Sequence, residues 1–263
     1  MFTPAHRGGP RDAEPLVLLH GFTETWRSWE LVLPMLERRH DVLAITLAGH
    51  AGGPPLGTPL TDDTLVVAVE AAMDDAGFAT AHVAGNSLGG HVALQLAERG
   101  RARSVVALAP AGGWAADDPA PRALLAEQRA MVEELRRAPA PTLLAATPDG
   151  RRRATQLLVE RSDHLDAAFV GHLLRAVAAC DAEPMLAHAA AHGWPRDPAR
   201  IACPVRVVWG TADRLLPWPR AAHRYAHDWL PHADWVVLDG AGHAPHVERP
   251  LEAAQLILGW SAP

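Results

Sequence analysis

The stretch Gly85-Asn86-Ser87-Leu88-Gly89-Gly90, called the elbow below, joins an apolar run at 81–85 to a segment of helical character at 87–98. Ser87 therefore lies between a predicted strand and a predicted helix, with glycine two positions away on each side. Glycine leaves room for a very tight turn, which strains the serine and aims its hydroxyl out of the sheet. This spacing is typical of a nucleophilic serine. The N–H of Leu88, at the positive end of the helix, lies where an oxyanion would form.

A serine hydroxyl is a weak nucleophile until a base takes its proton and an acid orients that base. Asp213 comes just after the apolar run 205–209, and His243 lies in the loop that follows the last predicted strand. Ends of parallel strands are where sheets of this kind place functional groups. The chain order Ser87, Asp213, His243 is also an established order for such a triad. We therefore predict Ser87 as nucleophile, His243 as base and Asp213 as acid.

Two residues compete for these roles. Asp239, at the end of the last predicted strand, is the alternative acid, and Asp213 is favoured by its strand–loop position. His246 is the alternative base, but it lacks the Gly-x-Gly turn that precedes His243. A serine is also a common helix N-cap. That simpler interpretation of Ser87 leaves the two flanking glycines and the matching Asp and His unexplained.

Strands and helices alternate over both ends of the chain. Six apolar runs are predicted strands: 16–19, 41–47, 81–85, 104–109, 205–209 and 235–238. Predicted helices lie between or after them: 26–38, 61–75, 87–98, one after Pro219 and one after Pro250. Such alternation predicts an α/β fold, with a mainly parallel central sheet that carries helices on both faces.

The alternation stops in the middle of the chain, where no buried strand pattern is found. Helical segments are predicted there at 121–137, 151–161 and 166–180, with proline breaks between or beside them. We therefore predict a core domain of residues 1–112 and 199–263, and a helical lid of residues 113–198 inserted into it. Trp114 and Trp194, at the two edges of the lid, are candidates to line a pocket.

Composition excludes several classes of function. All 24 basic residues are arginine, so chemistry that needs a lysine, such as Schiff-base formation or a P-loop, is excluded. The net charge is -6 and the basic run Arg151-Arg152-Arg153 is short, so nucleic acid is not expected as a partner. Cys180 and Cys203 are too few for a disulfide scaffold.

Location and cofactors are also constrained by the sequence. The N-terminus has no apolar secretory region, and no apolar run approaches the ~20 residues that span a bilayer. We expect a soluble cytoplasmic protein without a membrane partner. The histidines show no metal-ligand spacing such as H-E-x-x-H, so we expect no metal and no cofactor. The oligomeric state is left open.

The chain resembles the α/β-hydrolase family over nearly its whole length. The resemblance lies in the elbow, in His20-Gly21-Phe22, in a G-x-x-D segment at 210–213 and in Gly240-Ala241-Gly242-His243-Ala244-Pro245. It implies that the N–H of Phe22 joins that of Leu88 in an oxyanion hole. It also implies that His20 has a structural hydrogen-bonding role behind this loop.

Two departures from the family pattern are visible. The stretch Thr46-Leu47-Ala48-Gly49-His50-Ala51 lacks the Asp and Pro of the usual D-x-P-G-x-G. The segment before Leu16 is short, so we expect the first part of the sheet to be reduced.

The resemblance implies acyl transfer to water, with a small-molecule carboxylic ester of small or medium acyl group as substrate. Serine instead of aspartate at position 87 argues against haloalkane dehalogenase and epoxide hydrolase activity. The alternative is a C–C hydrolase of the meta-cleavage-product type, whose elbow resembles this one, although the glycine-rich loop of those enzymes is missing after Phe22. A lactonase, a thioesterase and a non-catalytic ligand-binding protein remain further alternatives.

Overall fold

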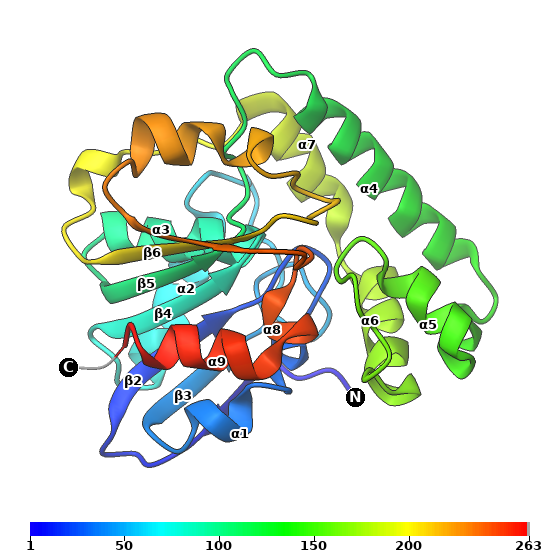
Figure 1. Cartoon of the computed structure of the whole chain (residues 1–263), viewed down its shortest axis with the longest axis horizontal. Coiled ribbons are helices and arrows are strands. Elements are labelled where there is room, and N and C mark those ends of the chain that lie inside the picture. Colours follow the sequence, from blue (N-terminus) through cyan, green and yellow to red (C-terminus); the bar gives the residue numbers. More distant parts are fainter. Residues whose placement is uncertain (262–263) are drawn as a thin grey trace.

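Seven strands form a single sheet in the computed structural model, which describes residues 1–261 (Figure 1). The strands are β1 (Ala5–Gly8), β2 (Glu14–Leu19), β3 (His40–Ile45), β4 (Ala81–Asn86), β5 (Ala102–Leu108), β6 (Val205–Gly210) and β7 (Asp234–Leu238). Their order across the sheet is β1-β3-β2-β4-β5-β6-β7. β1 runs antiparallel to β3, and the other neighbours are parallel. The predicted α/β fold with a mainly parallel sheet is confirmed.

The inner strands are largely apolar because both faces of the sheet are covered. Side chains alternate between the two faces of a strand. Val17 and Leu19 of β2 accordingly pack into one core, and Leu16 and Leu18 pack into the other. Each of these side chains is at most 1% exposed. Burial of one such side chain stabilises the fold by roughly 1.5–3 kcal/mol, so the sheet is a rigid base for the loops at its edge.

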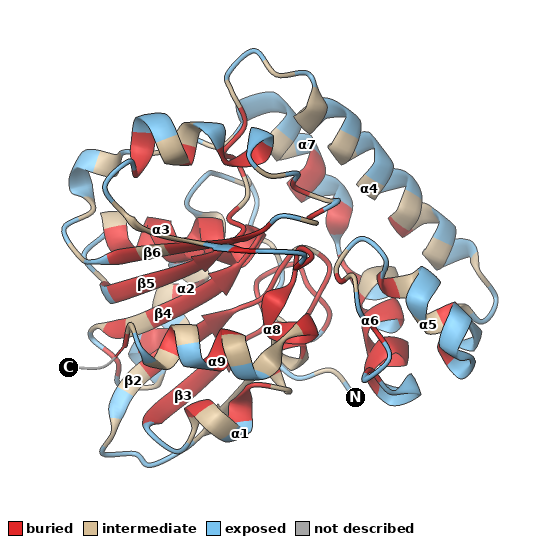
Figure 2. Ribbon diagram, in the orientation of Figure 1, coloured by how far each residue is buried: buried red, intermediate tan, exposed pale blue. Residues whose placement is uncertain are grey.

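Helices cover the two faces. α2 (Thr64–Asp75) and α3 (Leu88–Glu98) contribute to the first core, and the short α1 (Leu33–Leu36) and α9 (Pro250–Leu258) contribute to the second. Figure 2 shows the central strands and α3 mostly buried. Within residues 1–261, no helix is long and apolar enough to cross a membrane.

Between β5 and β6 the described chain forms helices and no strand. They are α4 (Ala120–Arg137), the 3₁₀ helix η2 (Pro141–Ala146), α5 (Pro148–Thr155), α6 (Ala167–Ala179), α7 (Ala182–His192) and the 3₁₀ helix η3 (Pro198–Arg200). Figure 1 shows α4, α5, α6 and α7 together on one side of the molecule. These helices are called the helical insertion below.

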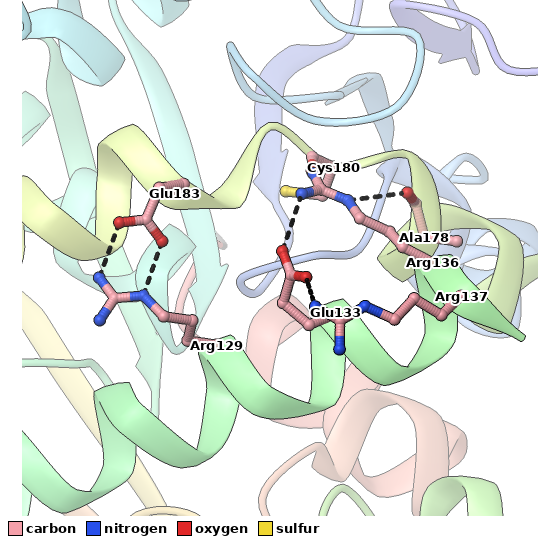
Figure 3. Close-up of polar contacts among 7 residues, drawn as sticks. All are labelled: Arg129, Glu133, Arg136, Arg137, Ala178, Cys180 and Glu183. Atoms are coloured by element: carbon pink, nitrogen blue, oxygen red, sulfur yellow. Dashed lines mark hydrogen bonds and ion pairs between the residues drawn. The ribbon is translucent and has the colours of Figure 1, made fainter.

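Polar contacts attach α4 to the chain around α7 (Figure 3). The guanidinium of Arg129 donates to both carboxylate oxygens of Glu183, at 2.6 and 2.9 Å. Arg136 donates to the backbone carbonyls of Ala178 and Cys180. Val132 is the buried apolar residue of α4. The helix therefore rests on a small apolar cluster and a set of half-exposed charges.

Several predicted helices are wrong in extent or type. The helix predicted at 26–38 is a 3₁₀ helix, η1 (Trp26–Trp29), followed by α1, because Pro34 lacks the N–H that a continuous helix requires. The helix predicted at 151–161 is α5 and ends at Thr155. The helix predicted after Pro219 is a 3₁₀ turn, η4 (Arg220–Ala222), and a π-helix, η5 (Tyr225–Trp229).

One helix is missing from the sequence prediction altogether. Pro184 is one of the predicted proline breaks, but it lies in the first turn of α7. Proline is tolerated there because the first N–H groups of a helix have no intrahelical partner. The short segment before Leu16 holds β1, a strand of four residues.

Candidate active site

The elbow connects β4 to α3 and holds Ser87 in an unusual backbone conformation. Ser87 has φ of 53° and ψ of -114°, a backbone conformation that residues other than glycine rarely adopt. Three backbone hydrogen bonds fix it. Its N–H donates to the carbonyl of Leu108 at 2.9 Å, and its own carbonyl accepts the N–H groups of His91 and Ala111 at 3.0 Å. Strain that the surroundings hold in place in this way is characteristic of functional residues.

The flanking glycines are required by close backbone contacts. A Cβ atom at Gly85 would lie 2.2 Å from the carbonyl oxygen of Gly89. A Cβ atom at Gly89 would lie 2.1 Å from the carbonyl oxygen of Leu19, in β2. Any side chain at either position would push the elbow away from the sheet.

Asp213 and His243 form a buried pair. The Nδ1 of His243 lies 2.7 Å from Oδ2 of Asp213, and the exposed fractions of the residues are 1% and 4%. The other carboxylate oxygen, Oδ1, accepts the N–H groups of Leu215 and Leu216 at 2.9 and 2.7 Å. These bonds fix the carboxylate, so that Nδ1–H of the imidazole donates to it and Nε2 is left as the proton acceptor.

Asn86 ties the histidine loop to the elbow. Its Nδ2 donates to the backbone carbonyl of His243 at 3.0 Å and to that of Leu108 at 3.1 Å. These bonds hold the loop of His243 against the elbow. Within the described chain the Ser87 hydroxyl makes no hydrogen bond to His243, and the buried Nε2 of His243 has no partner. The three residues thus come from the ends of three parallel strands into one site.

The two rival residues lie in different surroundings. Asp239 is exposed, and its Oδ1 lies 3.2 Å from the hydroxyl of Thr211. His246 is buried and stacks on Trp29, with ring centroids 4.1 Å apart. Burial lowers the pKa of His246 to about 3, so its ring is neutral at physiological pH.

The backbone N–H groups of Leu88 and Phe22 are the predicted oxyanion hole beside Ser87. Leu88 is the first residue of α3, so its N–H has no intrahelical partner. Neither Leu88 nor Phe22 donates its N–H to another residue in the part of the chain that is described. His20 supports the loop from behind: its Nδ1 lies 2.7 Å from the Gly21 carbonyl, and its Nε2 accepts the Leu47 N–H at 2.9 Å.

The sequence interpretation missed two supporting residues, Asn86, which bonds to the backbone of His243, and Glu24. Glu24 is 4% exposed, and its carboxylate accepts the Gly21 N–H at 3.1 Å, which anchors the loop that carries Phe22. Burial raises the pKa of this carboxyl. The sequence offers one signal for this anchor, an acidic residue three positions after Gly21. That spacing does not by itself show that the carboxylate is buried.

A cavity of about 100 Å³ lies at Ser87 and is called the Ser87 cavity below. Its walls come from the core and from the helical insertion, and most are apolar. Trp114 and Trp194 both line it, which confirms that prediction. Other lining residues include Phe22, Leu88, His91, Gln95, Leu124, Leu125 and Leu186.

A second cavity, of about 370 Å³, lies under the insertion and is called the insertion cavity below. Residues of α4, α5 and α6 line it, together with Glu24 and Leu158. The two cavities share four lining residues: Phe22, Leu124, Gln128 and Leu215. They therefore adjoin each other at the loop that carries Phe22. Among residues 1–261, no cluster of three or more His, Cys, Asp or Glu side chains could hold a metal ion.

Comparison with known proteins agrees with this geometry. A sequence model described as "Alpha/beta hydrolase family" matches residues 16–256. An epoxide hydrolase of Mycobacterium tuberculosis is 34% identical over 206 residues, which cover 72% of this chain and 89% of that protein. A pimeloyl-[acyl-carrier protein] methyl ester esterase of Aromatoleum aromaticum is 31% identical over 262 residues, 92% of this chain and 96% of that protein. Among solved structures, 2-hydroxy-6-oxo-6-phenylhexa-2,4-dienoate hydrolase from Rhodococcus sp. strain RHA1 superimposes with a TM-score of 0.76 at 22% identity, covering 98% of this chain and 96% of that one.

Proposed function

The chain belongs to the alpha/beta hydrolase family, and we propose that it is a carboxylesterase whose nucleophile is Ser87. The observation that carries the proposal is the buried Asp213–His243 pair, tied through Asn86 to a strained serine at the end of β4. The similarity to a methyl ester esterase over 92% of the chain supports the same reaction class. No step of this chemistry requires a cofactor.

The geometry supports the following sequence of steps. Nε2 of His243 accepts the proton of the Ser87 hydroxyl while the serine oxygen attacks the ester carbonyl. The N–H groups of Phe22 and Leu88 stabilise the negative charge that develops on the carbonyl oxygen. His243 then gives the proton to the departing alcohol, and Asp213 stabilises the imidazolium meanwhile. Water, activated by the same histidine, releases the acid and restores Ser87.

We also propose that residues 113–198 act as a lid on a core of residues 1–112 and 199–263. The support is that the insertion contributes Trp114, Leu124, Leu186 and Trp194 to the wall of the Ser87 cavity. A cover of this kind excludes water from the acylation step and strengthens the electrostatic interactions inside the site.

Epoxide hydrolysis, which the name of one relative suggests, does not suit a serine nucleophile at position 87. Attack of a serine oxygen on an epoxide would leave an ether, which has no carbonyl for water to attack. Turnover through that route would therefore stop after one step. Opening of an epoxide also needs a proton donor for its oxygen. The hydroxyl of the chain's single tyrosine, Tyr225, is buried and already donates to the Ala111 carbonyl at 2.7 Å. A C–C hydrolase, a lactonase or a thioesterase would use the same acyl-enzyme on Ser87.

The proposal is tested with p-nitrophenyl esters of graded acyl length, assayed beside a meta-cleavage dienoate, a lactone and a thioester. We expect turnover of the short and medium esters, and a loss in Ser87→Ala on the order of a million-fold in kcat. An organophosphate should label Ser87 and no other serine. Labelling at another serine, or full activity in Ser87→Ala, would refute the assignment. Preferred turnover of the dienoate would move the substrate class to C–C hydrolysis.

A further inference from the structure

The two cavities adjoin at the loop that carries Phe22, and in the proposed reaction each can take one part of the ester. The departing alcohol must lie on the side of His243, which returns the proton to it. Leu158 lines the insertion cavity, and its carbonyl accepts the N–H of Ala244, the neighbour of His243, at 2.8 Å. Ser87 lines the Ser87 cavity and not the insertion cavity, and none of residues 240–248 is among the described residues that line either one. The acyl chain of the substrate therefore extends into the Ser87 cavity, and the alcohol points toward the insertion cavity.

The wall of the Ser87 cavity that α3 forms is polar, and Thr61, Asp62, Gln128 and His188 add polar groups elsewhere. Ser87, His91 and Gln95 all line the α3 wall, and they are spaced four residues apart along α3. Residues four apart lie on the same face of a helix, about 6 Å from each other along the axis. Leu124, Leu125 and Leu186 form part of the apolar wall. An acyl chain that leaves Ser87 along α3 thus meets the His91 ring first.

The residue His91 is buried, and one of its two ring nitrogens, Nδ1, is unsatisfied within residues 1–261. The exposed fraction of the residue is 5%. The Ala111 carbonyl beside the ring already accepts the Tyr225 hydroxyl at 2.7 Å. The edge of the ring packs against Trp194, with ring centroids 4.8 Å apart. A buried polar group without a partner costs roughly 1–3 kcal/mol, so its retention beside a binding cavity points to a ligand.

The charge state of His91 limits which group it binds. Burial, together with the nearby Arg196 cation, holds the pKa of His91 well below its usual value of 6.5. The ring is therefore neutral at physiological pH and offers one donor and one acceptor nitrogen. This suits a keto, hydroxyl or ether oxygen better than a carboxylate, which a neutral ring does not compensate.

We propose that His91 is a specificity residue that binds a neutral polar group on the acyl chain, about 6 Å from the scissile carbonyl along α3. The proposal rests on the esterase function and narrows it. The substrate class is an ester whose acid part carries a keto, hydroxyl or ether oxygen several bonds from the ester carbonyl.

The test compares p-nitrophenyl 5-oxohexanoate with p-nitrophenyl hexanoate, in the wild type and in His91→Phe. Phenylalanine keeps the ring shape and removes both ring nitrogens. We expect the ratio of kcat/KM for the oxo ester over the plain ester to fall about tenfold in His91→Phe. His91→Asn and His91→Gln carry amides near the positions of Nδ1 and Nε2, and at least one should restore part of the ratio. His227→Phe, at an exposed position on η5, is the matched control and should leave both rates unchanged.

Two further measurements separate this proposal from the esterase proposal. Calorimetric binding of methyl 5-oxohexanoate and methyl hexanoate to Ser87→Ala, with and without His91→Phe, tests recognition without turnover. If the wild type turned over neither ester but binding still differed between the two esters in a way that depends on His91, only the esterase proposal would be overturned. An unchanged ratio in His91→Phe, in both rates and binding, would overturn the role of His91. A His91 effect confined to an ester with the keto group on its alcohol, 4-oxopentyl against pentyl hexanoate, would overturn the acyl-side assignment.

Discussion

The two helices that face each other across the Ser87 cavity are built very differently. In α3, ten of 11 residues are buried, whereas in α4 one of 18 is buried. Figure 2 shows the contrast between the buried α3 and the half-exposed α4. α3 carries the elbow and packs against the sheet, and α4 is attached through ion pairs such as Arg129–Glu183.

The difference separates two tasks of the site. A proton transfer requires groups that stay within hydrogen-bond distance, so the reacting residues lie where displacement costs most. A substrate must enter and leave, so the opposite wall is built from an element with low local stability. We therefore expect changes on the α3 side to affect chemistry and global folding. Changes on the α4 side should affect local opening and substrate preference.

The largest effect is expected at the acid of the proposed triad. Asp213→Asn keeps the shape but holds the imidazole in the wrong tautomer and cannot stabilise its positive charge. The kcat should therefore fall about 10⁴-fold. Asp239→Asn, at an exposed position, is the matched control and should lose little. A crippled Asp239→Asn with an active Asp213→Asn would move the acid to Asp239 and leave Ser87 and His243 in their roles.

The second effect contrasts a glycine of α3 with one of the insertion. Gly89→Ala places a Cβ 2.1 Å from the Leu19 carbonyl, and should destabilise the fold by about 4 kcal/mol or more. Gly171→Ala, inside α6, meets only atoms at 3.6 Å or more. It should stabilise by up to about 1 kcal/mol, because alanine favours a helix over glycine. Urea unfolding of both variants checks this. Equal changes in unfolding free energy for the two variants would show that α3 and the helical insertion tolerate an added side chain equally, against this prediction.

Acid should destabilise the core through its buried histidines. Burial lowers the pKa of four of them in the folded core: His20, His50, His91 and His246. The unfolded chain takes up protons near pH 6.5, so stability is complete above that value and falls as pH drops below it. Glu24 opposes this trend, since burial raises its pKa, but it is one group against four.

His246 provides the test of this acid effect. Its folded pKa is about 3, so between pH 6 and 4 it should contribute about 1.4 kcal/mol of lost stability per pH unit. His246→Phe, which keeps a ring against Trp29, should lower the slope of unfolding free energy against pH by that amount. His172, in α6, has its pKa lowered to about 4 and should act mainly on local opening, read from amide exchange in α6. If the slope of unfolding free energy against pH were the same in His246→Phe as in the wild type, His246 would not be a source of the acid effect.

The smallest effect is expected on the surface of α4. Arg129→Ala removes the ion pair with Glu183, whose partners are about half exposed, and should cost roughly 0.2–1 kcal/mol, with less cost at high salt. Arg122→Ala is the control, since Arg122 is exposed on the same helix and makes no ion pair within residues 1–261. Amide exchange of α4 should rise in Arg129→Ala while that of α3 stays the same. A global loss of stability as large as that in Gly89→Ala would break the contrast between the two helices.

Sequence patterns predicted the parts of the fold that depend on near neighbours. The six apolar runs are strands, and the glycines of the elbow have the close backbone contacts that their spacing indicates. The Asp213–His243 bond joins the two residues that the loop motifs singled out. Their triad roles, and the lid role of residues 113–198, stay predictions.

The sequence by itself determined the alternating elements, the elbow and the order of its three candidate residues, because periodicity and turn chemistry act over a few positions. The tertiary structure decided the rest. The partner of Asn86, the burial of Glu24 and the unsatisfied Nδ1 of His91 depend on residues far along the chain or on a cavity that only the folded chain encloses.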